Sequence, residues 1–347
     1  MMLMKRKWIW PLLSLLLAVL TVSMVLSQLG EMPLRQFWET VIEADDRYLA
    51  AAAVCGALFL VLEGEALRCI LRGAGYGRSF RSGLLYSAAD IYFSAVTPSA
   101  TGGQPASALF MHRDRIPAGV VTAALLVNLV MYTLSVVLLG LGAAVADLQM
   151  LAGFSLVSKV LIGAGFVILT GLTVFFFVLL GRGESVFGAL RRLAGLLHRW
   201  KLIRRLDHAL ERLDRAQRDH KVCAELMRGK TGTLLKAFVL NFFQRAARIA
   251  VPMFTYLALG GNGHMARRVF AAQCFITIGY NCVPVPGGMG VADYLMLDGF
   301  SDLMEFEDAI HLEVLSRSIS FYICVAVSGV IVLIGSFLQR KRRRQST

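Results

Sequence analysis

Charged residues are scarce in this sequence. Only 17% of its 347 residues are Asp, Glu, Lys or Arg, and 56% are hydrophobic, whereas soluble domains carry roughly 25% charged residues. Several apolar runs exceed the roughly 20 residues that cross a hydrocarbon core of about 30 Å. These features exclude a soluble multi-domain enzyme. They predict an all-α integral membrane protein, a polytopic helical bundle that forms one transmembrane domain over residues 1–347.

The usual patterns of metal, nucleotide and hydrolase sites are also missing. The six cysteines are scattered without CxxC or Cys/His spacing, and the six histidines form no HExxH pair. No serine lies in a G-x-S-x-G turn. The segment 228–231 (RGKT) lacks the upstream glycine and the strand of a P-loop. We therefore expect no disulfide, metal, cofactor or ATP site, and we assign no catalytic residue.

Positive charge is in excess, at +13, but it does not indicate a nucleic-acid partner. The Lys and Arg residues form short blocks beside the apolar runs, as the positive-inside rule expects. The blocks at 5–7 and 340–344 place both termini on the cytoplasmic side of the inner (plasma) membrane. The apolar run that begins at Trp8 is too long for a signal peptide and lacks a cleavage site, so we expect a retained first span.

Six apolar runs are long enough to be complete helical spans. They lie at about 8–29, 48–71, 118–146, 154–180, 231–259 and 309–338. Two other runs are interrupted by proline and glycine. The run 83–111 contains TPSATGGQP at 97–105, and the run 269–300 contains PVPGGMG at 284–290. Proline removes a backbone donor and glycine tolerates non-helical dihedral angles, so each run is predicted to break near its middle.

The charges that flank the broken runs predict how they enter the membrane. Arginines lie on both sides of the first broken run, in segments 72–82 and 112–117, so we expect a re-entrant hairpin that enters from the cytoplasm. Acidic segments at 30–47 and 302–308 suggest that the second hairpin enters from outside, although Arg267 and Arg268 oppose that placement. The basic C-terminal tail lies on the cytoplasmic side only if the second hairpin enters from outside.

With these assignments the chain divides into halves of like order, about 8–146 and 154–338, related by an inverted-topology repeat. The alternative is that proline and glycine merely kink two ordinary spans. Between the halves, residues 184–230 predict an amphipathic cytoplasmic helix or helix pair. Its arginines would face anionic lipid headgroups. Packing of this segment against the bundle is equally compatible with the pattern.

A broken helix exposes backbone N–H groups and a positive dipole end at membrane depth, where a lipid phosphate is the natural ligand. Such ends are expected near Gln104 and Val291. Arg245 and Arg248 share one helix face and could grip a phosphate, or form salt bridges that only fix packing. The candidate headgroup-binding residues are Thr101, Gly102, Gly103, Gln104, Arg245, Arg248, Pro286, Gly287, Gly288, Gly290 and Asp293.

Ionisable residues inside spans are costly unless they are paired or line a wet cavity. Four further residues of this kind are candidate charge partners. They are Glu63, Glu65, Asp90 and Arg317.

These motifs resemble a known family. The segments 93–105 and 284–293, together with Arg317 and residues 320–322 (SFY), are similar to the lysylphosphatidylglycerol synthase transmembrane-region family. This is the flippase-like half of the multiple peptide resistance factor, associated with antibiotic resistance. The family often has Glu where this chain has Asp293, which keeps the carboxylate but shortens its reach.

The resemblance implies that the chain moves aminoacylated phospholipid, such as aminoacyl-phosphatidylglycerol, between leaflets. In that family a soluble domain makes this lipid from aminoacyl-tRNA. The chain ends at Thr347, soon after its last span, so we expect no such transfer by this chain alone and a separate synthase as a partner. A homodimer is left open.

The leading hypothesis is therefore a lipid flippase. The alternatives are a membrane enzyme or subunit of lipid or polyprenyl-glycolipid synthesis, including a phosphatidylglycerol lysyltransferase, and a scaffold for a separate synthase.

Overall fold

The computed structural model describes residues 34–97, 101–199, 229–281, 283 and 290–345, with isolated positions between 207 and 225. Every regular element in these ranges is a helix. The predicted span 8–29 lies outside the described residues, as do the motif positions 98–100 and 284–289, which include Pro286, Gly287 and Gly288.

Four of the described helical stretches are long and apolar enough to cross a membrane. They are α3 (Asp46–Gly73), α6 (Ala118–Ala146), the first part of α8 (Leu156–Arg199), and the last helical stretch of the chain. That last stretch joins α13 (Phe306–Arg317), a π-helical turn η4 (Ser318–Ile323) and α14 (Cys324–Gln345). The predicted spans 48–71, 118–146, 154–180 and 309–338 are thus confirmed as helices, and the chain is a multi-pass membrane protein.

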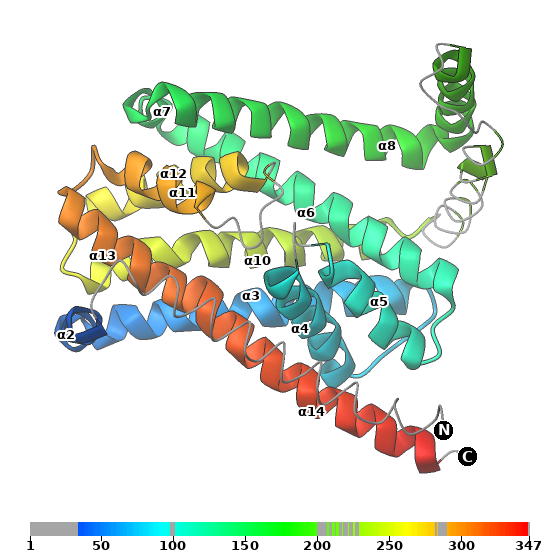
Figure 1. Cartoon of the computed structure of the whole chain (residues 1–347), viewed down its shortest axis with the longest axis horizontal. Helices are drawn as coiled ribbons and strands as arrows, with labels where there is room; N and C mark the ends of the chain where they lie inside the picture. The colour runs from blue at the N-terminus through cyan, green and yellow to red at the C-terminus, as the bar shows by residue number, and fades with distance from the viewer. Residues whose placement is uncertain are drawn as a thin grey trace.

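Helix α10 (Thr231–Ala258) differs from these four. Its 28 residues reach about 42 Å at 1.5 Å per residue, but it is not among the helices apolar enough to cross a membrane. It packs antiparallel along α3 (Figure 1) and turns polar side chains into the bundle. Asn241 Nδ2 donates to Asn128 Oδ1 of α6 at 3.0 Å. Because one face of α10 packs inside the bundle, the helix does not need an apolar surface all round, and the predicted span 231–259 stays a prediction.

Both interrupted runs are broken, as the proline and glycine residues predicted. The first consists of α4 (Phe80–Val96) and α5 (Gly103–Arg113), and the second of α11 (Gly263–Asn281) and α12 (Val291–Phe300). The two helices of each pair pack against each other. The pairs lie toward opposite ends of the bundle (Figure 1). The structure therefore contains two helical hairpins rather than two kinked helices.

The connections between helices lie at two opposite ends of the bundle. At one end, Arg78 Nη2 donates to the Asp114 carbonyl at 2.8 Å and Gln339 Nε2 donates to Asp114 Oδ1 at 2.8 Å. At the other, Asp45 N donates to the Ala258 carbonyl at 2.8 Å, and Asp147 pairs with Arg268 near the start of α11. We call these the Asp114 end and the Asp147 end. The first hairpin enters from the Asp114 end and the second from the Asp147 end, as the predicted topology requires.

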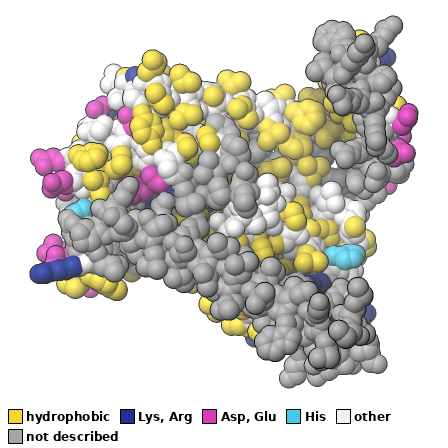
Figure 2. Space-filling view, in the orientation of Figure 1, with side chains coloured by type: hydrophobic (Ala, Val, Ile, Leu, Met, Phe, Trp, Pro, Cys, Tyr) yellow, Lys and Arg dark blue, Asp and Glu magenta, His cyan; other side chains and the backbone are white. Residues whose placement is uncertain are grey.

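The Asp147 end is acidic, even though it includes Arg267 and Arg268. Arg268 Nε lies 3.1 Å from Asp147 Oδ2, which offsets one of the two charges that opposed an outside placement. A cavity of about 980 Å³ at this end is lined by several carboxylates, among them Glu39, Glu43 and Glu305. Figure 2 shows acidic side chains gathered there, at the left of the view. Which end faces the cytoplasm stays a prediction.

The contacts between the two halves of the chain are reciprocal. The first hairpin packs on the last helix of the second half, through α4 and α14, and the second hairpin packs on the last helix of the first half, through α11 and α6. The corresponding helices α3 and α10 form the antiparallel pair between them. This arrangement supports an inverted-topology repeat.

Helix α8 runs beyond the predicted end of its span. It continues to Arg199 through a kink at Arg182, where φ is −134° and ψ is 42°. Arg191 Nη2 donates to Asp214 Oδ1 and to Gln217 Oε1, both at 2.6 Å. This arginine, which was expected to face lipid headgroups, is therefore held by the segment 184–230 itself.

Candidate functional site

A cavity of about 580 Å³ opens beside the first break. It brings together residues from four separate elements: Glu63 of α3, Asp90 of α4, Thr101 and Gln104 at the break, and Arg245 of α10. All five were candidates from the sequence. We call this space the acidic cavity, because two carboxylates and one guanidinium line it.

The carboxylates of the acidic cavity are held inside the bundle by polar contacts. Glu63 is buried, and its Oε2 accepts a hydrogen bond from Gln244 Nε2 at 2.8 Å. Asp90 interacts electrostatically with Glu63, of like charge, and with Arg245, of opposite charge. Ser94 Oγ lies 3.4 Å from Asp90 Oδ1. The cavity is thus a polar site that carries its own counter-charge.

The two arginines of α10 lie against aromatic rings. The Arg245 guanidinium is 3.9 Å from the Tyr132 ring centroid, and that of Arg248 is 4.9 Å from the Phe59 centroid. Such contacts stabilise a cation by about 0.5–2 kcal/mol. Within the described part of the chain neither arginine forms an ion pair. The rings therefore position both cations and leave their charge available to an anion.

Glycine is required where the first hairpin turns back. A Cβ on Gly103 would lie 2.5 Å from the Asp90 carbonyl oxygen, and closer still to Asp90 Oδ1 and Ser94 Oγ. The start of α5 thus presses on the Asp90 carboxylate, which complements the positive end of the helix dipole. The side chain of Asp90, rather than open space, meets this helix end.

Gly103→Ala is expected to destabilise the protein by about 1–3 kcal/mol, because the added methyl group must push α5 away from α4. Denaturant titration in mixed micelles, followed by circular dichroism, measures the loss. Gly142→Ala is the matched control, because nothing lies within 4 Å of a Cβ there. An equal effect at both glycines would contradict the close packing described above.

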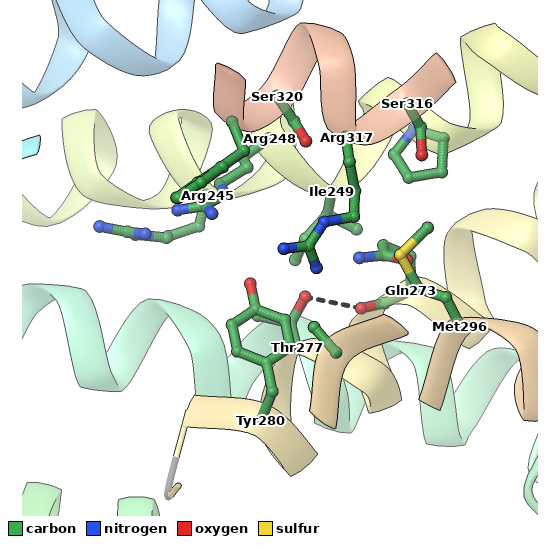
Figure 3. A pocket seen from close by; sticks show the side chains of 13 residues that line it. Arg245, Arg248, Ile249, Gln273, Thr277, Tyr280, Met296, Ser316, Arg317 and Ser320 are labelled. Carbon is green, nitrogen blue, oxygen red and sulfur yellow. Dashed lines mark hydrogen bonds between the residues drawn. The ribbon is translucent and has the colours of Figure 1, made fainter. Parts of the chain in front are cut away.

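A second, smaller cavity lies on the other side of Arg245. It has a volume of about 30 Å³ and is lined by Arg245, Arg248, Gln273, Tyr280 and Arg317, among others. Arg317 projects from α13 toward Tyr280 of α11 (Figure 3). We call this space the arginine cavity. Arg245 lines both cavities, so the two form neighbouring parts of one polar region between the hairpins.

Carboxylates hold Arg317 in the arginine cavity. Its Nη1 forms an ion pair with Asp293 Oδ1, and its Nε lies 3.5 Å from Glu313 Oε1. Asp293 Oδ2 also accepts a hydrogen bond from Gly290 N at 2.7 Å, which caps α12. Gly290 has a φ of +75°, a conformation that glycine adopts without strain. Asp293 therefore links the start of α12 to Arg317.

Comparison with known families decides the membership of the chain. The family model described as "Lysylphosphatidylglycerol synthase TM region" matches residues 11–328. The chain belongs to this family. No curated protein matches it. Because the match covers both hairpins and both cavities, membership in the lysylphosphatidylglycerol synthase TM region family supports a function connected with membrane lipids.

The structure of this family member groups most of the predicted site residues, but not all. Arg248 and Arg317 line the arginine cavity, and Asp293 pairs with Arg317 and accepts from Gly290 N. Glu65 lies elsewhere, because it pairs with Arg68, whose Nε donates to the Arg78 carbonyl at 3.0 Å near the Asp114 end. Glu65 is thus not a charge partner of either cavity.

A carboxylate lies at each predicted amide end of the broken helices. Asp90 packs against the start of α5, and Asp293 caps the start of α12. The physical reason is that N–H donors in a low-dielectric bundle must be satisfied, and a nearby carboxylate does this well. The cations that remain for a phosphate are Arg245, Arg248 and Arg317.

Sequence reasoning did not find the uncharged polar residues of the site. Gln244, Tyr132 and Gln273 line or support the two cavities, but they are not among the charged residues that the sequence marks inside the spans. Nor did the sequence reveal the π-helical turn η4, which begins directly after Arg317. Such turns are frequent at functional sites. Polar residues within apolar helices were the signal available for the first three.

Proposed function

We propose that this protein moves phospholipid between the two membrane leaflets, with aminoacylated phosphatidylglycerol as a substrate. The observation that carries the proposal is the position of Arg245, shared by two polar cavities between two oppositely entering hairpins. Charged groups within membrane helices are costly unless they pair or line a wet cavity. Their clustering here supports a path for a polar headgroup.

The charges of the two cavities suit the two ends of an aminoacylated headgroup. Arg245 and Arg248 offer guanidinium groups to the phosphate, which accepts two parallel hydrogen bonds from such a fork. Glu63 and Asp90 offer carboxylates to an ammonium group. Since Arg245 lies between these sets, one headgroup could contact both.

The hairpin arrangement is the second support. Broken helices at corresponding positions of an inverted repeat place transporter sites near the middle of the bilayer. Here the hairpins enter from the Asp114 end and the Asp147 end. The first break borders the acidic cavity, and Tyr280 and Ala292, from the two helices of the second hairpin, line the arginine cavity. A headgroup could therefore be approached from either leaflet.

Reconstituted vesicles test the proposal. Purified protein is incorporated into vesicles with fluorescent aminoacyl-phosphatidylglycerol, or with other fluorescent phospholipids, and transfer is followed by quenching of the outer leaflet. We expect transfer that depends on the protein and exceeds that of empty vesicles. No protein-dependent transfer across several headgroups would reject the proposal.

Arg248→Ala and Asp293→Asn are expected to slow this transfer about tenfold. Arg248→Ala removes a charge-assisted hydrogen bond to the phosphate, and Asp293→Asn removes the carboxylate that pairs with Arg317. Each such contact contributes about 1.5–3 kcal/mol, and 1.4 kcal/mol corresponds to a factor of ten. Initial rates in the same vesicles measure the effect. Arg267→Gln, at an exposed position, should transfer lipid at the parent rate. Unchanged rates for Arg248→Ala and Asp293→Asn would remove both residues from the site.

The description of the family names a synthase, which favours a subunit of lipid synthesis as the second candidate. Lipid extracts from cells with and without the gene discriminate between the two. A missing lipid species would favour synthesis. An unchanged total with altered exposure in the outer leaflet would favour transport. Co-purification would reveal a separate synthase.

A further inference from the structure

Arg317 is the most deeply buried cation of the site. Only 6% of its surface is exposed, and it points into the arginine cavity (Figure 3). Asp293, Glu313 and Tyr322 interact with its guanidinium, yet its Nη2 is buried without a hydrogen-bond partner in the described part of the chain. A buried donor without a partner costs about 1–3 kcal/mol, so this atom has capacity for a ligand.

The arginine cavity has an excess of positive charge. Three arginines line it, Arg245, Arg248 and Arg317, whereas in the described part of the chain two carboxylates, those of Asp293 and Glu313, pair with Arg317. Nε of Arg245 is also buried without a partner. Ser316 and Ser320 add hydroxyl groups to the lining. Guanidinium donors from several arginines match the tetrahedral oxygens of a phosphate group.

The present size of the cavity excludes that phosphate. Its volume of about 30 Å³ holds about one water molecule. The Asp293 carboxylate pairs with the same guanidinium that a phosphate would use. Asp293 also caps α12 through Gly290, so a group that displaced this carboxylate would loosen the start of α12 as well.

We propose that the arginine cavity is the phosphate subsite, in which Arg317 joins Arg245 and Arg248 and a phosphate group competes with the Asp293 carboxylate for Arg317. This inference deepens the proposed function, on which the choice of a lipid as its ligand rests. The recognised chemistry is a phosphate ester or free phosphate. Release of Asp293 from Arg317 opens the cavity, and its return expels the phosphate.

Binding measurements on the full chain in detergent test the subsite. The probes are dihexanoyl phosphatidic acid, inorganic phosphate, and dihexanoylglycerol, which lacks the phosphate, each titrated by calorimetry at fixed ionic strength. Asp293→Asn removes the competing charge and should tighten phosphate binding about tenfold. Arg248→Gln should weaken it about tenfold, since 1.4 kcal/mol corresponds to that factor. Arg267→Gln is the matched control and should bind as the parent does.

Both test variants should remain folded. Arg248 forms no ion pair in the described part of the chain, so its loss leaves no carboxylate unpaired. Asparagine at position 293 keeps an oxygen that can accept from Gly290 N. Tighter phosphate binding in Asp293→Asn together with weaker binding in Arg248→Gln supports the subsite. If only phosphatidic acid shows this pattern, the ligand is a lipid. If inorganic phosphate shows it too, free phosphate also binds.

Equal binding of dihexanoylglycerol and phosphatidic acid, or unchanged affinity in Asp293→Asn, would overturn the subsite. Its failure can be told apart from that of the proposed function. A protein that binds phosphate in this pattern but transfers no lipid would overturn lipid transport alone. Transfer without the binding pattern would overturn the subsite alone.

Discussion

Replacement of Arg317 by Met should lower the free energy of unfolding by about 3–5 kcal/mol, the usual cost of leaving one partner of a buried ion pair alone. The Arg317 side chain is 8% exposed, and its partners Asp293 and Glu313 are 22% and 13% exposed. Solvent therefore screens these carboxylates little once the guanidinium is removed. Methionine keeps an unbranched stem in place of the arginine methylene groups but removes the guanidinium, so the loss of the charge is the main change.

Denaturant titration in mixed micelles measures this loss. Arg35→Met is the matched control, because Arg35 and Glu39 form an ion pair with side chains 90% and 54% exposed, and such surface pairs contribute little. Adding Asp293→Asn to Arg317→Met should recover part of the stability, because one unpaired carboxylate disappears. Equal losses for Arg317→Met and Arg35→Met would show that Arg317 is not an interior charge.

Replacement of Arg245 by Gln should reduce lipid transfer roughly 30-fold or more. Losing a charge-assisted hydrogen bond to the phosphate costs about 1.5–3 kcal/mol, and 2 kcal/mol corresponds to roughly 30-fold. Arg245 lines both cavities, so its loss affects the headgroup on either side. It also leaves Asp90 beside Glu63 without the nearby cation.

The initial rate of transfer in vesicles measures this effect, with the amount of folded protein fixed by size-exclusion chromatography. Arg245→Lys keeps the charge but not the planar group stacked on Tyr132, so its rate should lie between those of the parent and of Arg245→Gln. Arg267→Gln again controls for the loss of one positive charge. A parent-like rate in Arg245→Gln would remove Arg245 from the transfer path.

The secondary structure of this protein was largely predictable. The run 118–146 was expected as a span, and α6 is Ala118–Ala146. The breaks were expected at 97–105 and 284–290, and the flanking helices end at Val96 and Asn281. Helix length, proline and glycine act locally, because they depend on the backbone of neighbouring residues, so the sequence contains this information directly.

The choice between Glu63 and Glu65 was not predictable. These residues are two apart on α3. At 3.6 residues per turn the helix rotates by about 200° from one to the other, so they point to nearly opposite sides. Both looked alike as acidic residues in an apolar run. Only the packing of α3 against α10 decides that Glu63 meets Gln244 while Glu65 turns to Arg68.

Long-range ion pairs were equally unpredictable from the sequence. Arg268 opposed the predicted topology until the structure placed it 3.1 Å from Asp147. The partners are 121 residues apart, and no periodic pattern links positions at that separation.

By itself the sequence determined a membrane protein of apolar helices with two breaks, because hydrophobicity and backbone preferences are properties of each segment alone. The tertiary structure alone decided which charges meet. It brings Arg245, Arg248 and Arg317 together from two helices, and it pairs Asp293 with Arg317 rather than leaving this carboxylate for a ligand. Such encounters depend on the rotation and crossing of packed helices, which are fixed only when all the segments are assembled.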